Sequence, residues 1–329
     1  MTRVTGVRFV IVVCVLVALT SPFFGMSVIT PAALFDAGSP DFELFWRLRL
    51  PRVVLAFLSG AGLAVSGMVF QALFRNPLAT PFTLGVSSGA ALGASLYFRL
   101  GAGVTVLGSL GSIGAALTGG LISVATVYLI TRAKGGFSTP VMLLAGVIIN
   151  FFFSSLVMFI QYLSSTQDSM RILHWLMGSL SGIEIPRLPD LAFVVIVGAL
   201  CIGRITQEID LLTAGEDIAA SRGVRVGQTK LIIFLAASAM VGTIVSMAGP
   251  ISFVGMMVPQ ICRILFGWSH RRLLPVVFFM GGAFLILCDL AARTLLAPAE
   301  LPIGIITALL GGPFFLWTLF RAGRNDELF

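Results

Sequence analysis

The chain has 329 residues, of which 57% are hydrophobic and only 11% are charged. Long runs without Lys, Arg, Asp or Glu place it among proteins that cross a membrane several times, and exclude an ordinary soluble protein. The formal charge of +7 does not indicate nucleic-acid binding, because the basic residues are scattered in short loops between apolar runs.

The apolar segments predict the fold class. A hydrocarbon core about 30 Å thick needs about 20 helical residues, so the sequence predicts an all-α membrane protein with about ten transmembrane helices in one polytopic domain, 1–329. The first follows Arg3 and Arg8 and could pass for a secretory signal peptide, but we interpret it as a retained span. The segments lie near 7–27, 53–73, 82–100, 106–131, 139–163, 190–206, 230–248, 250–266, 273–296 and 303–321.

The distribution of basic residues predicts the orientation. If the N-terminus is cytoplasmic, about two thirds of the 21 Lys and Arg fall on the inner side, as the positive-inside rule requires. An even number of spans then places both termini in the cytoplasm.

The stretch WRLRLPR (46–52) departs from that rule, because Arg47, Arg49 and Arg52 gather on the outer side just before the second span. These side chains could reach lipid headgroups or pair with Asp41 and Glu43. They could instead dock an acidic partner, since an arginine fork matches a carboxylate.

The loop FRNPLATP (74–81) joins the second and third predicted spans on the inner side. Its prolines remove backbone donors and bias the preceding residues, Asn76 and Thr80, away from helix. The loop is either a plain turn or part of a constriction that Asn76 and Leu78 help to form.

Small residues at intervals of four predict close packing of the third and fourth spans, because helices in lipid associate where their backbones can approach; a flexible hinge is the alternative. These residues are Gly85, Gly89 and Gly93 in the third span, and Gly111, Ala115 and Gly119 in the fourth.

A second polar stretch, TAGEDIAASRG (213–223), has the pattern of a short helix. Thr213 and Glu216 have the spacing of a capping box, and Gly223 suits the left-handed position after a helix. A helix over 214–222 would be about 13 Å long, too short to span the bilayer. It would lie at the inner surface, as a solvated loop or as a docking surface that also carries Asp217 and Arg222.

Few other residues suggest chemistry. Asp289 is the one carboxylate in the interior of a predicted apolar span, and Arg293, one turn later, can neutralise it. His174 in the outer loop is weak as a haem-iron ligand, and the four Cys show no paired spacing. Of the two lysines, Lys134 and Lys230, neither lies in a phosphate-binding loop, so any ATP would be hydrolysed by another polypeptide.

Several stretches together resemble the FecCD family, the permease subunits of ATP-binding-cassette importers for iron-siderophores, haem and cobalamin. They are 48–94, which runs from LRLPRVV to the glycine-rich segment, GFSTPVMLLAG (136–146), LTAGEDIAASRGV (212–224), 248–275 and 288–319. The likeness covers nearly the whole chain beyond the first span.

The resemblance implies a protomer of ten spans in which spans 2–5 and 7–10 are inverted repeats. It implies a dimer, which we expect to be a homodimer although a paralogous partner is open, with a path along the subunit interface. Two peripheral ATPase subunits would bind ATP and Mg, and an outer substrate-binding protein, periplasmic or lipoprotein, would deliver the cargo. This chain would bind no cofactor or metal, catalyse no reaction, and reside in the bacterial inner membrane.

The resemblance also implies roles for particular residues. The short helix would be the coupling helix, seated in an ATPase cleft through Thr213, Glu216, Asp217, Arg222 and Gly223. The cytoplasmic gate would comprise Asn76, Leu78 and Thr139, and the contacts with the binding protein would be Arg49, Arg52 and Arg293. At Gln260 the family commonly has His, so any role of that side chain is open.

We therefore expect an importer permease that works by alternating access. An ion-coupled secondary transporter, also built from inverted repeats, is the alternative, and a membrane scaffold without transport is a third class. Whether the cargo is a siderophore, haem or cobalamin does not follow from the residues.

Overall fold

The computed structural model describes residues 3–25, 27, 29–36, 38–101, 111–134, 138–182 and 185–322. Within these ranges the regular structure is helical, without strands. The helices are α1 (Arg3–Thr20), α2 (Pro40–Glu43), α3 (Leu50–Phe74), α4 (Val86–Leu100), α5 (Gly111–Ala133), α6 (Thr139–Leu163), α7 (Thr166–Leu176), α8 (Leu188–Arg204), α9 (Thr206–Ala214), α10 (Glu216–Ser221), α11 (Val226–Ala248), α12 (Val254–Phe266), α13 (His270–Thr294) and α14 (Ile303–Ala322).

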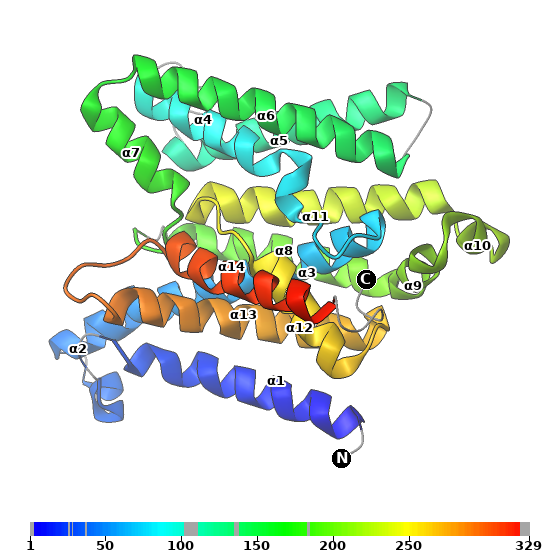
Figure 1. The fold of residues 1–329 in the computed structure, drawn as a ribbon. Helices are drawn as coiled ribbons and strands as arrows, with labels where there is room; N and C mark the ends of the chain where they lie inside the picture. The colour runs from blue at the N-terminus through cyan, green and yellow to red at the C-terminus, as the bar shows by residue number, and fades with distance from the viewer. Residues whose placement is uncertain are drawn as a thin grey trace.

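Helix α3 is the centre of the bundle. From Leu58 to Phe74 every residue is buried, and the helix packs on α13, α11 and α12. A helix that is apolar all round is stable only when other helices enclose it. Helices α4, α5 and α6 form a layer beyond α11, and α1 lies along α13 on the opposite side (Figure 1).

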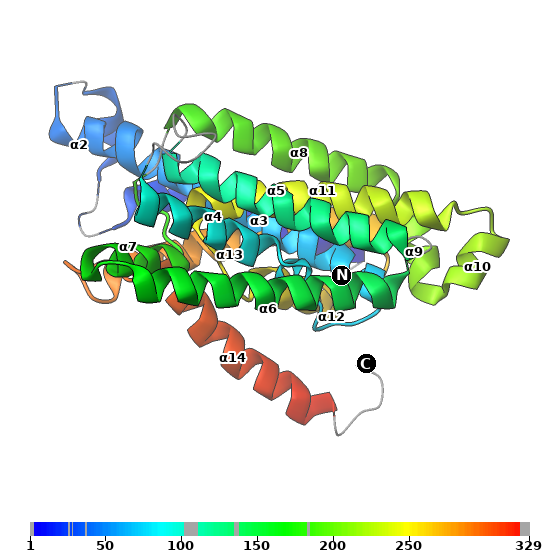
Figure 2. The ribbon, with the colours of Figure 1, turned by 90° about the horizontal axis from the view of Figure 1, so that it is seen from above.

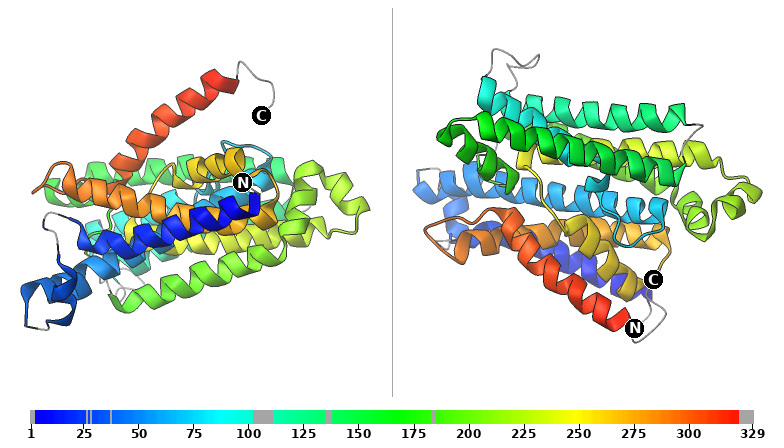
Figure 3. Two further views of the ribbon diagram at one scale, coloured as in Figure 1. Left: turned by 90° about the horizontal axis from the view of Figure 1, so that it is seen from below. Right: turned by 45° about the horizontal axis from the view of Figure 1, so that its top comes forward.

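The molecule has two distinct ends (Figure 2). Helices α9 and α10 project at one end, where α1 begins and α14 ends. Helices α2 and α7 and the connection from α13 to α14 lie at the other end. Helix α14 leans away from the bundle (Figure 3) and contacts α12 and α13.

Each of the ten predicted apolar segments contains a helix, although 106–110 lies outside the described residues. By length and composition, seven helical segments within the described ranges could cross a membrane, and two shorter apolar helices are α12 and Ile303–Thr318. Helix α4 has only 15 residues. The all-helical multi-pass fold is confirmed, whereas the count of ten spans and the inverted repeats stay predictions.

The predicted packing of α4 on α5 is confirmed. A Cβ added to Gly89 would fall against the carbonyl of Gly119, and one added to Gly93 would fall against that of Ala115. Gly111 lies outside this close approach, because only the Tyr97 hydroxyl, at 3.8 Å, would come near a Cβ there. Glycine and alanine therefore allow backbone contact between these helices, which is how helices associate in lipid.

Candidate functional site

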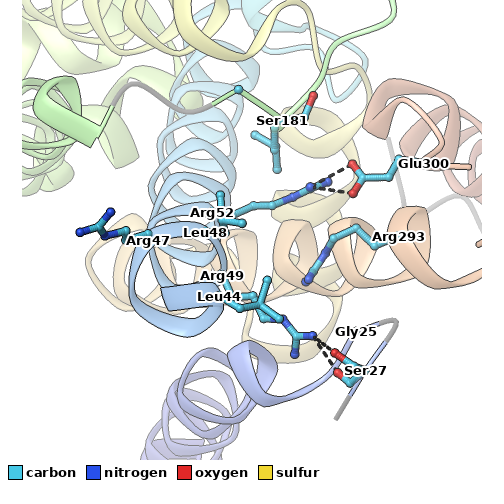
Figure 4. Close-up of a pocket in the computed structure, with 12 residues that line it drawn as sticks. Gly25, Ser27, Leu44, Arg47, Leu48, Arg49, Arg52, Ser181, Arg293 and Glu300 are labelled. Carbon is cyan, nitrogen blue, oxygen red and sulfur yellow. Dashed lines mark hydrogen bonds and ion pairs between the residues drawn. The ribbon is translucent and has the colours of Figure 1, made fainter. Parts of the chain in front are cut away.

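A pocket lined by arginines lies at the α2 end of the molecule (Figure 4). Its volume is about 590 Å³, and four basic side chains and one acidic side chain border it: Arg47, Arg49, Arg52, Arg293 and Glu300. A six-residue π-helical turn, Leu44–Arg49, joins α2 to α3 and carries two of the arginines. The structure thus brings together all three arginines that were predicted to dock a binding protein.

Arg49 is turned toward the end of α1. It is only 6% exposed, and its Nη1 donates to the carbonyls of Pro22 and Phe23 at 3.2 Å. Its Nη2 donates to the Ser27 carbonyl at 2.7 Å and to the Ser27 hydroxyl at 3.0 Å. These bonds satisfy carbonyls that the end of a helix leaves open. In this structure Arg49 therefore binds its own chain.

Arg52 joins two carboxylates from distant parts of the sequence. Its Nε donates to Oδ1 of Asp289 at 2.9 Å, and its Nη1 donates to Glu300 at 3.0 and 3.2 Å. Asp289 also pairs with Arg293 at 3.0 Å, one turn along α13, which confirms the predicted neutralisation of this carboxylate. Arg293 is 6% exposed.

Of the pairings with Asp41 and Glu43 that the sequence suggests for the arginines of 46–52, one is present. Arg47 pairs with Glu43 at 3.5 Å, with both side chains mostly exposed. Glu300 could not be predicted from the sequence, because it lies 248 residues from Arg52 and only the fold brings them together.

At the opposite end, α9 and α10 form one unit with a sharp break between them. Gly215 has a φ of 149°, a conformation open to glycine. The predicted helix over 214–222 is found over Glu216–Ser221. It ends as predicted: Gly223 has a φ of 84°, its N–H bonds to the Ala220 carbonyl, and the next N–H bonds to that of Ala219.

The predicted capping box is wrong. Helix α9 continues through Thr213, so the Thr213 hydroxyl donates to the carbonyl of Asp210 at 2.7 Å and does not cap α10. The N-cap position of α10 is Gly215, which has no side chain. Glu216 is consequently free to bond elsewhere.

Glu216 bonds to two other helices of its own chain. Its Oε2 lies 2.7 Å from Nζ of Lys230 on α11, and its Oε1 accepts from the Thr139 hydroxyl on α6 at 3.2 Å. Lys230, only 2% exposed, also donates to the Thr139 hydroxyl at 3.1 Å. Burial opposes the charge of Glu216, but the bond and charge of Lys230 outweigh it and lower the pKa of the carboxyl.

The face of α10 that points away from the bundle carries exposed side chains. Asp217 and Arg222 are exposed, and Ile218 is 50% exposed. One exposed apolar side chain is ordinary at a protein surface, so these residues are accessible to a partner but do not by themselves indicate one. Of the residues predicted to contact an ATPase, Asp217 and Arg222 are exposed, whereas Glu216, with its side chain 44% exposed, is bonded to Lys230 and Thr139.

The residues predicted as a gate occupy two places. Asn76 and Leu78 lie in the same turn, where the Asn76 side chain accepts the Leu78 N–H at 2.9 Å. Leu78 is 53% exposed and, with Gln260 and residues of α14, lines a mainly apolar cavity of about 460 Å³. Thr139 is bonded to Glu216 and Lys230. Arg75, in the same loop as Asn76, has a left-handed backbone and donates to the Leu212 carbonyl of α9 at 3.1 Å.

A further pair at the α10 end was not predicted. Asp210 on α9 accepts from the backbone N–H of His270 at 2.9 Å and lies 2.6 Å from its Nδ1. Burial raises the pKa of the Asp210 carboxyl, but the bonds to His270 outweigh it, so the pKa is lowered. His174 lies in the last turn of α7, at the other end. Within the described residues no group of three metal-binding side chains is close enough to hold an ion.

A buried helical core, a polar pocket at one end and a short polar helix at the other define a multi-pass membrane protein with a polar surface at each end. The chain matches the FecCD transport family over residues 10–321, and it belongs to this family. It is 39% identical to the vitamin B12 import system permease BtuC of Escherichia coli O157:H7, over 95% of this chain and 94% of that one.

Two other permeases are comparably similar. The cobalamin import system permease BtuC of Halobacterium salinarum is 41% identical over 88% of this chain and 77% of that protein. The ABC transporter permease YvrB of Bacillus subtilis, which is described as uncharacterised, is 39% identical over 87% and 81%.

A solved structure titled as an inward-facing conformation of a metal-chelate type ABC transporter superposes with a TM-score of 0.84 at 29% identity. The match covers 96% of this chain and 98% of that one.

Proposed function

We propose that this chain is the membrane subunit of an ATP-driven importer that moves a metal chelate or a cobalamin into the cytoplasm. Relatives named for cobalamin import and a structural neighbour named for metal-chelate transport support this cargo class. Ferric siderophores and haem belong to the same class of bulky chelates.

The observation that supports the proposal is that the arginine pocket and the short polar helix α10 lie at opposite ends of one bundle (Figure 2). The α10 end would face the cytoplasm, where α10 would couple to an ATPase through Asp217, Ile218 and Arg222. The arginine pocket would face outward and receive acidic side chains of a substrate-binding protein. Thr213 and Gly223 would shape α10 rather than contact the ATPase, because one closes a turn of α9 and the other ends α10.

Arg49 and Arg293 reach a docking protein only from within the pocket, since each is 6% exposed. Arg52, with its side chain 14% exposed, is the most accessible of the three. A carboxylate that enters the pocket would compete with Glu300 for Arg52. Two such chains, which we take to be identical, would enclose the transport path, gated by Leu78 and the Asn76 turn.

Association with the ATPase tests the proposal. Asp217→Lys places a charge of the opposite sign in the contact, and Ile218→Glu places a charge where an apolar side chain would be desolvated. Each should therefore abolish copurification of the ATPase subunits from membranes. Asp190→Lys, at the start of α8 on the other end, is the matched control and should leave association intact. Unchanged copurification of the α10 variants would contradict a coupling role for α10.

A further inference from the structure

Three side chains connect the short helix α10 to two membrane helices, and the proposed contact of Asp217, Ile218 and Arg222 with an ATPase does not use them. They are Thr139 at the first residue of α6, Glu216 at the first residue of α10, and Lys230 in the second turn of α11. Each pair among the three lies within 2.7–3.2 Å. We name this group the α6–α10–α11 clamp.

Within the clamp, the Lys230 side chain is buried. Lys230 is 2% exposed, whereas lysine side chains normally keep their ammonium in water. Separating Glu216 from Lys230 would leave a buried ammonium without its carboxylate, which is strongly unfavourable. The burial of Lys230 therefore opposes separation of the pair, although the Glu216 side chain is 44% exposed, and the starts of α6, α10 and α11 are held together.

The clamp gives α10 a direct connection to α6. Helix α6 carries a long exposed apolar face that includes Leu144, Ile148, Phe151 and Phe152. Thr139, the first residue of α6, contacts α10, and the rest of α6 packs on α4 and α5. A displacement of α10 would pass to the start of α6 through hydrogen bonds, not only through the connecting chain.

We propose that Lys230 is a positioning residue that fastens α10 to the start of α6, so that α10, α6 and the start of α11 move as one body when α10 is displaced. This inference rests on the proposed function, in which an ATPase drives α10. It assigns a role to Lys230 and gives Thr139 and Glu216 a shared mechanical role in the chain.

Paired spin labels in the purified permease–ATPase complex test the inference. In one sample the labels replace Leu144 on α6 and Ala220 on α10. In a second sample they replace Leu265 on α12 and Ala220. All three positions are exposed. Distances are measured without nucleotide and with ATP trapped. We expect the α10–α12 distance to shift with ATP and the α10–α6 distance to stay constant.

Variants of the clamp supply the decisive comparison. In Lys230→Met the α10–α6 distribution should broaden without nucleotide and shift with ATP, because the connection is lost. Lys230→Arg should restore the wild-type behaviour, since it keeps the charge and the donors. Lys134→Met is the matched control, because Lys134 is the other lysine of the chain and is exposed at the end of α5.

The results either support the clamp or contradict it. A shift of the α10–α6 distance in the wild-type complex, or an unchanged distribution in Lys230→Met, would overturn the clamp. If Lys230→Met does not fold, Thr139→Val removes one hydroxyl and must still broaden the α10–α6 distribution. A constant α10–α12 distance in the presence of ATP, with the α10–α6 distribution still broadened by Lys230→Met, would contradict the driven motion of α10 and leave the clamp established.

Discussion

Oδ1 of Asp289 accepts a hydrogen bond from Nε of Arg52 at 2.9 Å, and this bond joins α13 to α3 beside the arginine pocket. Asp289 is 1% exposed and also neutralises Arg293, so one buried carboxylate serves two guanidinium groups. Without it, two cations would face each other in a poorly solvated site. This shared carboxylate explains how Arg52 and Arg293 can lie together in the pocket.

Replacement of Asp289 should therefore be costly. Asp289→Asn removes one partner of a buried ion pair and should lower the free energy of unfolding by about 3–5 kcal/mol. Denaturant unfolding in detergent micelles measures it. Glu43→Gln, which breaks the exposed pair with Arg47, is the control and should cost about 0–1 kcal/mol. Equal stability of the two variants would show that Asp289 does not hold the pocket together.

Glu300 should weaken docking, because it occupies Arg52 with a side chain that is 43% exposed. Glu300→Gln removes a negative charge from the pocket, so it should increase the affinity of an acidic binding protein a few-fold, mainly through faster association. The gain should shrink at high salt, because exposed charges are screened. Surface plasmon resonance at two salt concentrations measures it, with Asp190→Asn as the control. A loss of affinity would mean that Glu300 itself contacts the partner.

The contact between α4 and α5 should not accept a side chain at Gly89. A Cβ there would lie 2.7 Å from Cβ of Ser123 and closer still to the Gly119 carbonyl. Gly89→Val should therefore destabilise the fold by about 1–3 kcal/mol, the usual cost of overpacking. Gly227→Val, where a Cβ would meet nothing within 4 Å, is the matched control. Comparable thermal unfolding of both variants would refute the close approach.

The attachment of α10 to α11 should weaken at acidic pH. The pKa of Glu216 is lowered from its ordinary 4.5, so its bond to Lys230 contributes fully above pH 4.5 and is lost as the pH falls through the lowered value. Hydrogen exchange of the α10 amides should be slow and constant between pH 7 and 4.5, after correction for the intrinsic rate, and faster below. Glu216→Gln should abolish this acid step. A step of equal size in Glu216→Gln would assign it to another group.

The sequence predicted elements whose signal is local, and missed contacts between distant residues. Hydrophobic runs located a helix for each predicted segment, and the four-residue spacing of Gly89 and Gly93 predicted a real contact. The i, i+4 pair Asp289–Arg293 was predictable because both residues share one helix face.

Other features depended on tertiary packing. Thr213 has the spacing of a capping residue, but α9 continues through it, and only the backbone shows that Gly215 is where the chain breaks. Lys230 looked like an ordinary inner-side lysine. Its burial against Glu216 and Thr139 joins residues up to 91 positions apart, for which one sequence carries no local pattern.

Uptake into proteoliposomes tests the central claim most directly. The permease is reconstituted with its ATPase subunits and ATP in the lumen, and the cognate binding protein is added outside with radiolabelled cyanocobalamin or a ferric siderophore. We predict that one of these cargoes accumulates only when both ATP and the ATPase are present, and that Asp217→Lys abolishes the accumulation. Uptake driven by an ion gradient in liposomes that contain the permease alone would contradict an ATP-driven importer and favour a secondary transporter.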